Sequence, residues 1–204
     1  GMIATDQSII EHAGRYDFDL PHCLQVASIA QGLFDDCREM HGLGPRERDM
    51  LVFASILHDI GWSDGPSHHH KRARDLILAD PPAGLTVREV GVIANVARYH
   101  TRSLPKDSHK HFSRLDRQDQ CLVRRLAAIL RIADGLDAGH CGAVSYRRAA
   151  VCDGELLVEL DAEYDCPEEL AAAFRKANLF EEVFGLPVRF NATDPALEPA
   201  RSLA

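Results

Sequence analysis

The chain has 204 residues, of which 46% are hydrophobic and 26% charged, values typical of one sizeable globular domain with a small additional unit. Its net charge of −8 argues against general nucleic-acid binding, because an acidic surface repels a phosphate backbone, although a local basic pocket for a small phosphorylated ligand is still allowed. No stretch approaches the roughly 20 apolar residues that a membrane span needs, so we expect no membrane partner.

The spacing of the cysteines indicates the cellular compartment in which the protein folds. The six of them lie far apart and form no CxxC pair, which argues against both a zinc knuckle and a disulfide framework. The N-terminus also has no basic segment followed by an apolar run. We therefore expect a protein of the reducing cytoplasm.

Capping residues and chain breakers predict the first helices. Asp19 and Pro45 are placed at the starts of two of them, and Thr86 forms a capping box with Glu89. A polar, irregular connection is expected over 102–116. The predicted helices cover about 20–40, 45–60, 69–79, 86–101 and 118–138.

The pattern changes after residue 141. Asp153-Gly154 predicts a hairpin between strands over 144–151 and 155–160, followed by a helix over 167–184 and a strand over 186–190. The fold class is therefore mainly α, with a small C-terminal β-β-α-β unit that is too short to bury a core of its own. We expect this unit to pack on the helical domain or on a partner subunit, which leaves a homo-oligomer open. The expected parts are a helical domain (1–141), the small unit (142–191) and a loose tail (192–204).

Ionisable residues recur on the apolar faces of the predicted helices. Four of them share a helix face with apolar residues three or four positions away: His22, His69, His100 and Asp134. His58 and Asp59 add two more at the end of the most apolar helix. Burying such groups is costly unless they are paired, hydrogen-bonded or bound to metal. Six in one core need a shared partner, and a bound cation would provide one.

Each residue taken singly has a simpler explanation. A histidine on an apolar face is more often a hydrogen-bonded core residue, Asp134 could pair with Arg131, and the histidine run 68–70 could be solvated. Helical spacing does not establish that the four faces meet. The pattern alone therefore leaves both a metal site and a set of ordinary buried residues open.

The order of His22, His58-Asp59 and Asp134 resembles the HD superfamily of metal-dependent phosphohydrolases. The sequence is more closely similar to the C-terminal HD region of the exopolyphosphatase and guanosine pentaphosphate phosphohydrolase family, over about 20–191. The segments that carry this similarity are 41–48 (HGLGPRER), 57–61 (LHDIG), 97–100 (ARYH) and 125–137 (RLAAILRIADGLD).

The resemblance implies an HD-domain helical bundle with one or two divalent transition metals. One metal would be held by the first four of the candidate ligands: His22, His58, Asp59 and Asp134. His69 and His100 would hold a second, with Asp59 bridging. This nitrogen–oxygen donor set suits manganese, iron, cobalt, nickel or zinc better than calcium.

The resemblance also implies an enzyme that hydrolyses a small phosphorylated molecule, with a nucleotide as the leading substrate. Asp59 would be the catalytic residue, because it would both bind metal and orient the attacking water. Four basic residues near the ligand helices are candidate phosphate anchors, although each could equally be a solvated charge: Lys71, Arg72, Arg98 and Arg102.

Two departures from the family pattern limit the comparison. The family usually carries an actin-like catalytic domain, which this sequence lacks, so we expect long-chain polyphosphate to be a poor substrate. The family segment His-His-Lys-His-Ser aligns with residues 69–73 (HHKRA), which makes His69 the preferred ligand and His70 the reserve. The competing hypothesis is a regulatory module that keeps the fold and binds a nucleotide or polyphosphate without turnover.

Overall fold

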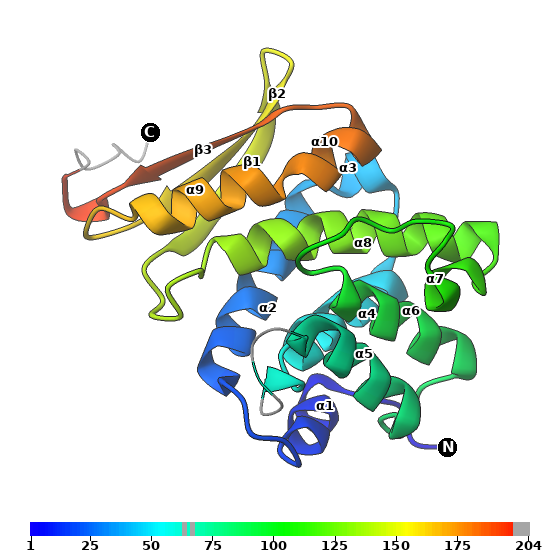
Figure 1. Cartoon of the computed structure of the whole chain (residues 1–204). Helices are drawn as coiled ribbons and strands as arrows, with labels where there is room; N and C mark the ends of the chain where they lie inside the picture. The colour runs from blue at the N-terminus through cyan, green and yellow to red at the C-terminus, as the bar shows by residue number, and fades with distance from the viewer. Residues whose placement is uncertain (63–64, 66–67, 198–204) are drawn as a thin grey trace.

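The computed structural model describes residues 1–62, 65 and 68–197, and helices dominate this part of the chain (Figure 1). The helical part contains α1 (Asp6–Ala13), α2 (Leu20–Asp36), α3 (Arg38–His41), α4 (Pro45–Leu57), α5 (His69–Ala79), α6 (Val87–Arg98), α7 (Lys110–Ser113) and α8 (Arg117–Gly135). The C-terminal unit contains β1 (Ser145–Cys152), β2 (Glu155–Asp161), α9 (Pro167–Lys176), α10 (Asn178–Phe184), β3 (Val188–Thr193) and a 3-10 turn (Pro195–Leu197). The predicted mainly helical fold with a small C-terminal sheet is confirmed.

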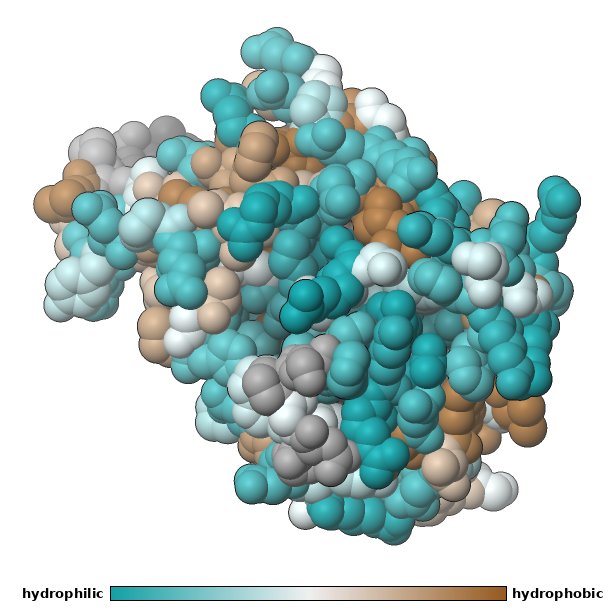
Figure 2. Space-filling view, in the orientation of Figure 1, coloured by the Kyte–Doolittle hydropathy of each residue, from teal (hydrophilic) through white to brown (hydrophobic). Residues whose placement is uncertain are grey.

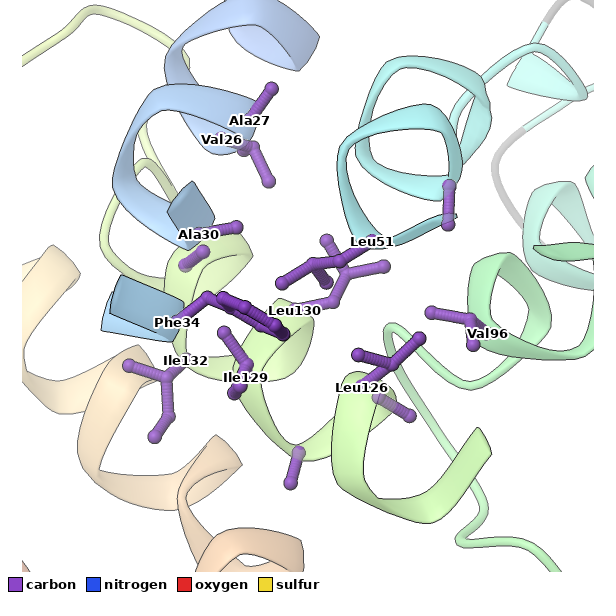
Figure 3. Close-up of a cluster of buried hydrophobic side chains, with 14 of the residues drawn as sticks. Val26, Ala27, Ala30, Phe34, Leu51, Val96, Leu126, Ile129, Leu130 and Ile132 are labelled. Atoms are coloured by element: carbon purple, nitrogen blue, oxygen red, sulfur yellow. The ribbon is translucent and has the colours of Figure 1, made fainter. Parts of the chain in front are cut away.

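Helix α8 packs against α2, α4 and α6 and forms the centre of the helical part. Figure 3 shows Leu126 and Leu130 of α8 among Phe34 of α2, Leu51 of α4 and Val96 of α6, and all five side chains are fully buried. Side chains packed this closely leave little room for one helix to slide along another. The packing of the apolar core therefore fixes the position in space of the end of each helix.

The predicted caps are present. The Asp19 carboxylate accepts a hydrogen bond from the backbone N–H of His22 at 3.1 Å, which fixes the first turn of α2. Thr86 and Glu89 form the reciprocal capping box at the start of α6. The sequence thus predicted correctly how these two helices begin.

The C-terminal sheet has the strand order β1-β2-β3. Strands β1 and β2 are antiparallel and joined through Asp153 and Gly154, both with positive φ, so the predicted hairpin is confirmed. Strand β3 is parallel to β2, and α9 and α10 make the connection between them. The chain therefore passes through both helices between the two parallel strands.

Two glycines let this unit approach the helical part closely. A Cβ atom on Gly32 of α2 would lie 2.4 Å from the Tyr146 ring of β1, and one on Gly135 of α8 would lie 2.8 Å from the backbone nitrogen of Ala173 in α9. Only a residue without a side chain fits at such positions. The C-terminal unit thus packs directly on α2 and α8, as its small size led us to expect.

The helix boundaries differ from the prediction at several places. Helix α1, which Thr5 and Ser8 cap reciprocally, was not predicted, and α7 lies in the connection expected to be irregular. The helix predicted over 20–40 breaks at Cys37. The helix predicted over 167–184 breaks at Ala177, because the Asn178 side chain accepts the N–H of Leu179 and competes with the helical backbone bonds.

The end of the chain is more regular than expected in its first residues. Strand β3 continues to Thr193, past the predicted end of the strand at residue 190 and into the range assigned to a loose tail. The turn Pro195–Leu197 follows. Parallel pairing with β2 as far as Asp161 supplies the backbone partners that keep this segment extended. The rest of the predicted tail, 198–204, lies outside the described residues.

Candidate metal centre

The six predicted ligands come together at the ends of helices. His22 lies in the first turn of α2, Asp134 in the last turn of α8, and His69 begins α5. Helices α4 and α6 end earlier than predicted, so His58, Asp59 and His100 lie in the turns just after them. The apolar core that fixes the helix ends therefore also positions this cluster of four histidines and two aspartates.

Two groups of possible metal ligands can be distinguished, which we call donor groups because their atoms could donate lone pairs to a cation. The first donor group is His22, His58 and Asp134. The Asp134 Oδ1 atom lies 3.0 Å from His22 Nε2 and 3.2 Å from His58 Nε2. Both imidazole side chains are fully buried. The Oδ2 atom of Asp59 faces the same two nitrogens at 3.6 Å each. Two carboxylates and two imidazoles thus surround one point inside the protein.

The second group of donors is Asp59, His69 and His100. His69 Nε2 lies 3.2 Å from His100 Nε2, and Asp59 Oδ1 lies 3.6 Å and 3.7 Å from these two nitrogens. Asp59 therefore turns one carboxylate oxygen to each group. The arrangement has the form of a bridging ligand between two neighbouring sites.

Acceptors behind the rings fix the orientation of three of the histidines. The Nδ1 atom lies 2.7 Å from the Asp137 carboxylate in His22, 2.5 Å from the Ser55 carbonyl in His58 and 2.6 Å from the Ala97 carbonyl in His100. These partners only accept hydrogen bonds, so Nδ1 carries the proton in each ring. The Nε2 lone pair of a neutral ring then points into the cluster, as it does in histidines that bind metals.

The pKa values of the buried histidines and of Asp134 indicate which of these side chains hold a proton when no cation is bound. Burial lowers the pKa of His58, but Asp59 and the other neighbours raise it well above its usual value. Burial raises the pKa of Asp134, and Lys176 together with the histidines brings it well below the usual value. Burial and the positive charge of His58 lower the pKa of His100 strongly. A metal ion would therefore compete with protons for the same lone pairs, and its binding would release them.

The donor chemistry fits a divalent transition metal. Imidazole nitrogen and carboxylate oxygen suit manganese, iron, cobalt, nickel and zinc, whereas calcium prefers oxygen alone. The facing nitrogens of His69 and His100 need a proton or a cation between them, because His100 Nε2 is an acceptor when Nδ1 donates. The residues present therefore fit one or two such ions.

Three contacts in the cluster were not predicted. Asp137 holds His22, and the ammonium group of Lys176 from α9 forms an ion pair with Asp134 Oδ2. His140 stacks on His22 with ring centroids 3.6 Å apart and planes 7° apart, while its Nδ1 lies 3.0 Å from Asp19. The spacing of Asp137 from Asp134, one turn later on the same segment, could have indicated it. No sequence signal indicated the other two.

His140 and Cys23 also lie close enough to the cluster to be considered as ligands. A histidine binds metal through a nitrogen lone pair in the plane of its ring, and the His22 and His140 rings stack face to face with centroids 3.6 Å apart, an arrangement that does not favour one ion shared by both rings. Burial raises the pKa of the Cys23 thiol, which disfavours the thiolate that binds metal. Ring stacking and thiol burial therefore make His140 and Cys23 weaker candidates than the six predicted ligands.

The predicted phosphate anchors lie in different environments. Lys71, Arg72 and Arg102 are exposed, whereas Arg98 is buried with its guanidinium 4.8 Å from the centre of the Tyr99 ring. Arg131, the alternative partner of Asp134, donates to the backbone carbonyls of Tyr99 and Arg102. The structure gives Asp134 the ion-pair partner Lys176 in its place.

Fold and cluster together define a mainly helical protein with a buried histidine–aspartate centre at its helix ends. Residues 5–161 match the family model described as Ppx/GppA phosphatase, domain III. This match spans most of the chain, so the protein belongs to the Ppx/GppA phosphatase domain III family. A comparison with curated proteins gave no match. None of the described helices has the length and hydropathy needed to cross a membrane.

Proposed function

We propose that the protein is a metal-dependent phosphohydrolase that acts on a small phosphorylated molecule, with nucleotides as the leading substrate class. The observation that carries the proposal is the orientation of His22, His58 and His100, whose Nδ1 atoms are all engaged outward. The Nε2 atom of each ring faces Asp59, and those of His22 and His58 also face Asp134. Membership in a phosphatase family supports the phosphoryl chemistry. A set of ordinary core histidines would not need three rings turned toward the same carboxylate.

The proposal places the chain in the HD superfamily. His22, His58, Asp59 and Asp134 would hold one divalent transition metal, and Asp59, His69 and His100 a second. When bound, such ions lower the pKa of water and stabilise negative charge on phosphoryl oxygens. The cytoplasm is the proposed compartment, because the six cysteines are free and form no disulfide framework. A near-neutral pH there would keep the metal ligands deprotonated.

The side chains of this chain would divide the work. Asp59 would orient the attacking water by accepting its hydrogen bond, since its two oxygens already face different donor groups. Asp137 would keep His22 in its tautomer, and Lys176 would hold Asp134 through the second carboxylate oxygen. The predicted anchors would neutralise phosphate oxygens: Lys71, Arg72, Arg98 and Arg102.

The rival function is a regulatory module that binds a nucleotide or polyphosphate without turnover. The observation that favours it is the family description itself, which names one domain of a larger phosphatase. The complete set of six donors favours the enzyme, because a pure scaffold would not need two carboxylates buried among four imidazoles. The two functions differ in a single measurable property, the release of phosphate.

The test combines metal analysis with a substrate panel. We expect near-stoichiometric transition metal after gentle purification, and phosphate release with added manganese from at least one nucleotide or small phosphomonoester. Asp59→Asn keeps the size of the side chain and removes its charge, so we expect the rate to fall by a factor of hundreds or more, roughly as for loss of a principal catalytic group. Asp49→Asn, at a half-exposed position of α4 whose carboxylate pairs with Arg46, is the matched control and should retain the rate.

Two results would contradict the proposal. A metal-free protein whose stability does not change on addition of manganese, iron, nickel or zinc would remove the metal centre. A metal-loaded protein that binds nucleotides tightly and releases phosphate from none of the panel would establish the regulatory module. Long-chain polyphosphate is included in the panel and is expected to be a poor substrate.

A further inference from the structure

Arg131 is a buried arginine whose donors are directed at the backbone of another segment. It lies in α8 and is 4% exposed. Its Nη1 atom donates to the carbonyl of Tyr99 at 3.1 Å and to the carbonyl of Arg102 at 3.3 Å. Within the part of the chain that the structure describes, no carboxylate forms an ion pair with Arg131. Its positive charge is therefore held by carbonyl groups.

A cation in this position is costly, so its retention needs a reason. Burial lowers the pKa of Arg131 to about 10, and the side chain therefore still carries its charge at neutral pH. A buried charge without a carboxylate partner is less favourable than a well-packed apolar side chain of similar volume. The guanidinium group, however, presents several N–H donors from a rigid plane and can bind two carbonyls at once. An apolar side chain would leave both carbonyls without this donor.

The two carbonyls bracket His100. Tyr99 and Arg102 lie in the turn that follows α6, and His100 lies between them. Arg102 has a φ of 65°, a conformation that is unfavourable for residues other than glycine and that persists where the surroundings hold it. The Ala97 carbonyl orients the His100 ring through Nδ1 at 2.6 Å. Arg131 thus holds the backbone from which that ring projects.

Arg131 also lies close to a ligand of the first donor group. Asp134 follows it by three residues on α8, which is about 4.5 Å along a helix axis. Asp134 faces His22 and His58, whereas His100 faces His69 in the second donor group. Arg131 therefore connects the helix that carries a ligand of the first group to the turn that carries a ligand of the second.

The outer side of the same turn offers little apolar support. Figure 2 shows strongly hydrophilic side chains gathered over α5 and over the connection that follows α6. Thr101 is half-buried and Arg102 is exposed. The position of the turn therefore depends mainly on the hydrogen bonds that it receives from inside the protein.

We propose that Arg131 is a positioning residue that sets the place of His100 relative to Asp134 and thereby governs binding of the second metal ion. The inference rests on the proposed function and adds to it a residue that touches neither metal nor substrate. The first donor group does not depend on the turn after α6, so loss of Arg131 should affect the two ions unequally.

The test is a manganese titration of the metal-free protein by equilibrium dialysis, followed by elemental analysis. We expect two ions per chain in the wild type. Arg131→Met should keep the first ion and bind the second at least about tenfold more weakly, since loss of a group that orients a ligand costs about 10–100-fold in metal affinity. Arg125→Met is the matched control and should bind both ions normally. Arg125 lies on the same helix and also donates to a backbone carbonyl, that of His41 at 3.5 Å.

Two further measurements separate positioning from a general structural role. Electron paramagnetic resonance distinguishes neighbouring manganese ions, which couple magnetically, from an isolated ion, and the coupled signal should disappear in Arg131→Met. Hydrogen–deuterium exchange of the metal-free protein should become faster in the segment 99–102 and stay unchanged in α2.

A conservative variant guards against misfolding of Arg131→Met. Arg131→Lys keeps the charge and a donor group but not the planar fork, so its affinity for the second ion should lie between those of the wild type and Arg131→Met. If Arg131→Met does not fold, the comparison of Arg131→Lys with the wild type decides. Equal weakening of both ions, or an unchanged affinity for the second ion in the folded variants, would overturn the inference.

The metal and turnover results separate this inference from the proposed function. A wild type that binds two ions in a manner that depends on Arg131 but releases phosphate from no compound keeps the positioning role and loses the proposed enzyme. A wild type that binds one ion and releases phosphate keeps the enzyme and overturns the inference.

Discussion

The helical part and the C-terminal unit fill their interiors in different ways. At one end of the helical part, histidines and aspartates are buried next to an otherwise apolar core. The C-terminal unit instead buries an alternating apolar row along β2, formed by Leu156, Val158 and Leu160. Its direct contribution to the polar cluster is Lys176, which pairs with Asp134.

The difference indicates that neither region is complete without the other. The sheet and α9 need α2 and α8 as the second half of their apolar core, because a three-stranded sheet of this size is marginal alone. The cluster needs the ammonium group of Lys176, because the Oδ2 atom of the partly buried Asp134 would otherwise lose its ion-pair partner. The residues matched by the family model end at 161, before α9, so this contact lies outside the matched segment.

Removal of the C-terminal unit should have the largest effect. A chain ending at residue 141 loses Leu179 and Phe180, each fully buried, at about 1.5–3 kcal/mol for each side chain, and exposes the apolar faces of α2 and α8. We expect aggregation or a large fall in Tm, measured by size-exclusion chromatography and thermal unfolding. A truncated protein that stays soluble, monomeric and equally stable would show that the helical part is complete without the C-terminal unit.

Loss of one carboxylate should be next in size. Asp134→Ala removes the carboxylate nearest to the Nε2 atoms of the buried His22 and His58 and the ion-pair partner of the partly buried Lys176, so we expect up to about 3–5 kcal/mol less stability and loss of bound metal. Urea unfolding and elemental analysis measure the two effects. Asp36→Ala in α2, which removes a carboxylate that accepts from Tyr146 of the sheet, is the control that tests the interface between the two regions without touching the cluster. Unchanged metal content in Asp134→Ala would contradict the ligand assignment.

The two adjacent histidines at the start of α5 should differ from each other. His69 lies in the second donor group, so His69→Ala should weaken binding of a second metal by at least about 10–100-fold, because loss of a group that only orients a ligand already costs that much. His70→Ala should leave metal content unchanged. Metal titration followed by elemental analysis compares the two variants, and the opposite outcome would transfer the ligand role to His70.

The smallest expected effect is a pH dependence confined to the helical part, since no histidine follows residue 140. Burial, followed by the charge of Arg98, lowers the pKa of His70 from 6.5 to about 4. The unfolded chain therefore takes up a proton below about pH 6.5 that the folded protein takes up only near pH 4, so this residue destabilises the fold as the pH falls between these values.

The contribution of His70 can be isolated by comparison with His70→Leu. At pH 5 we expect it to be at most about 2 kcal/mol relative to pH 7, so the wild type should lose more stability than the variant over this range. Urea unfolding of both proteins at the two pH values measures the difference. Equal losses in the two proteins would assign the pH dependence to other groups.

Much of the fold followed from local signals in the sequence. Asp19, Thr86 and Asp153-Gly154 specify two helix starts and a hairpin through short-range hydrogen bonds and backbone preferences, and these features were predicted correctly. The breaks at Cys37 and Ala177 were missed, because apolar periodicity continues across both and does not register a change in backbone direction.

The candidate site was only partly accessible from the sequence. Periodicity placed His22, His69, His100 and Asp134 on apolar faces, but only the packing of α2, α5, α6 and α8 determines that these faces meet. Lys176 could not be found in this way, because a lysine in an amphipathic helix normally points to solvent and its position depends on the approach of α9 to Gly135. The position of the His140 ring depends on a left-handed backbone conformation with φ of 55°, which no local sequence motif predicts.

Trp62 is the only tryptophan of the chain, and its ring lies 5.1 Å from that of His69 while 45% of the residue remains exposed. Its fluorescence therefore comes from one place in the molecule, at the edge of the second donor group. Changes in the charge or occupancy of His69 alter the electric field and the quenching groups around the indole. The protein thus carries its own optical reporter, which allows titrations of the cluster to be followed by emission intensity without any label.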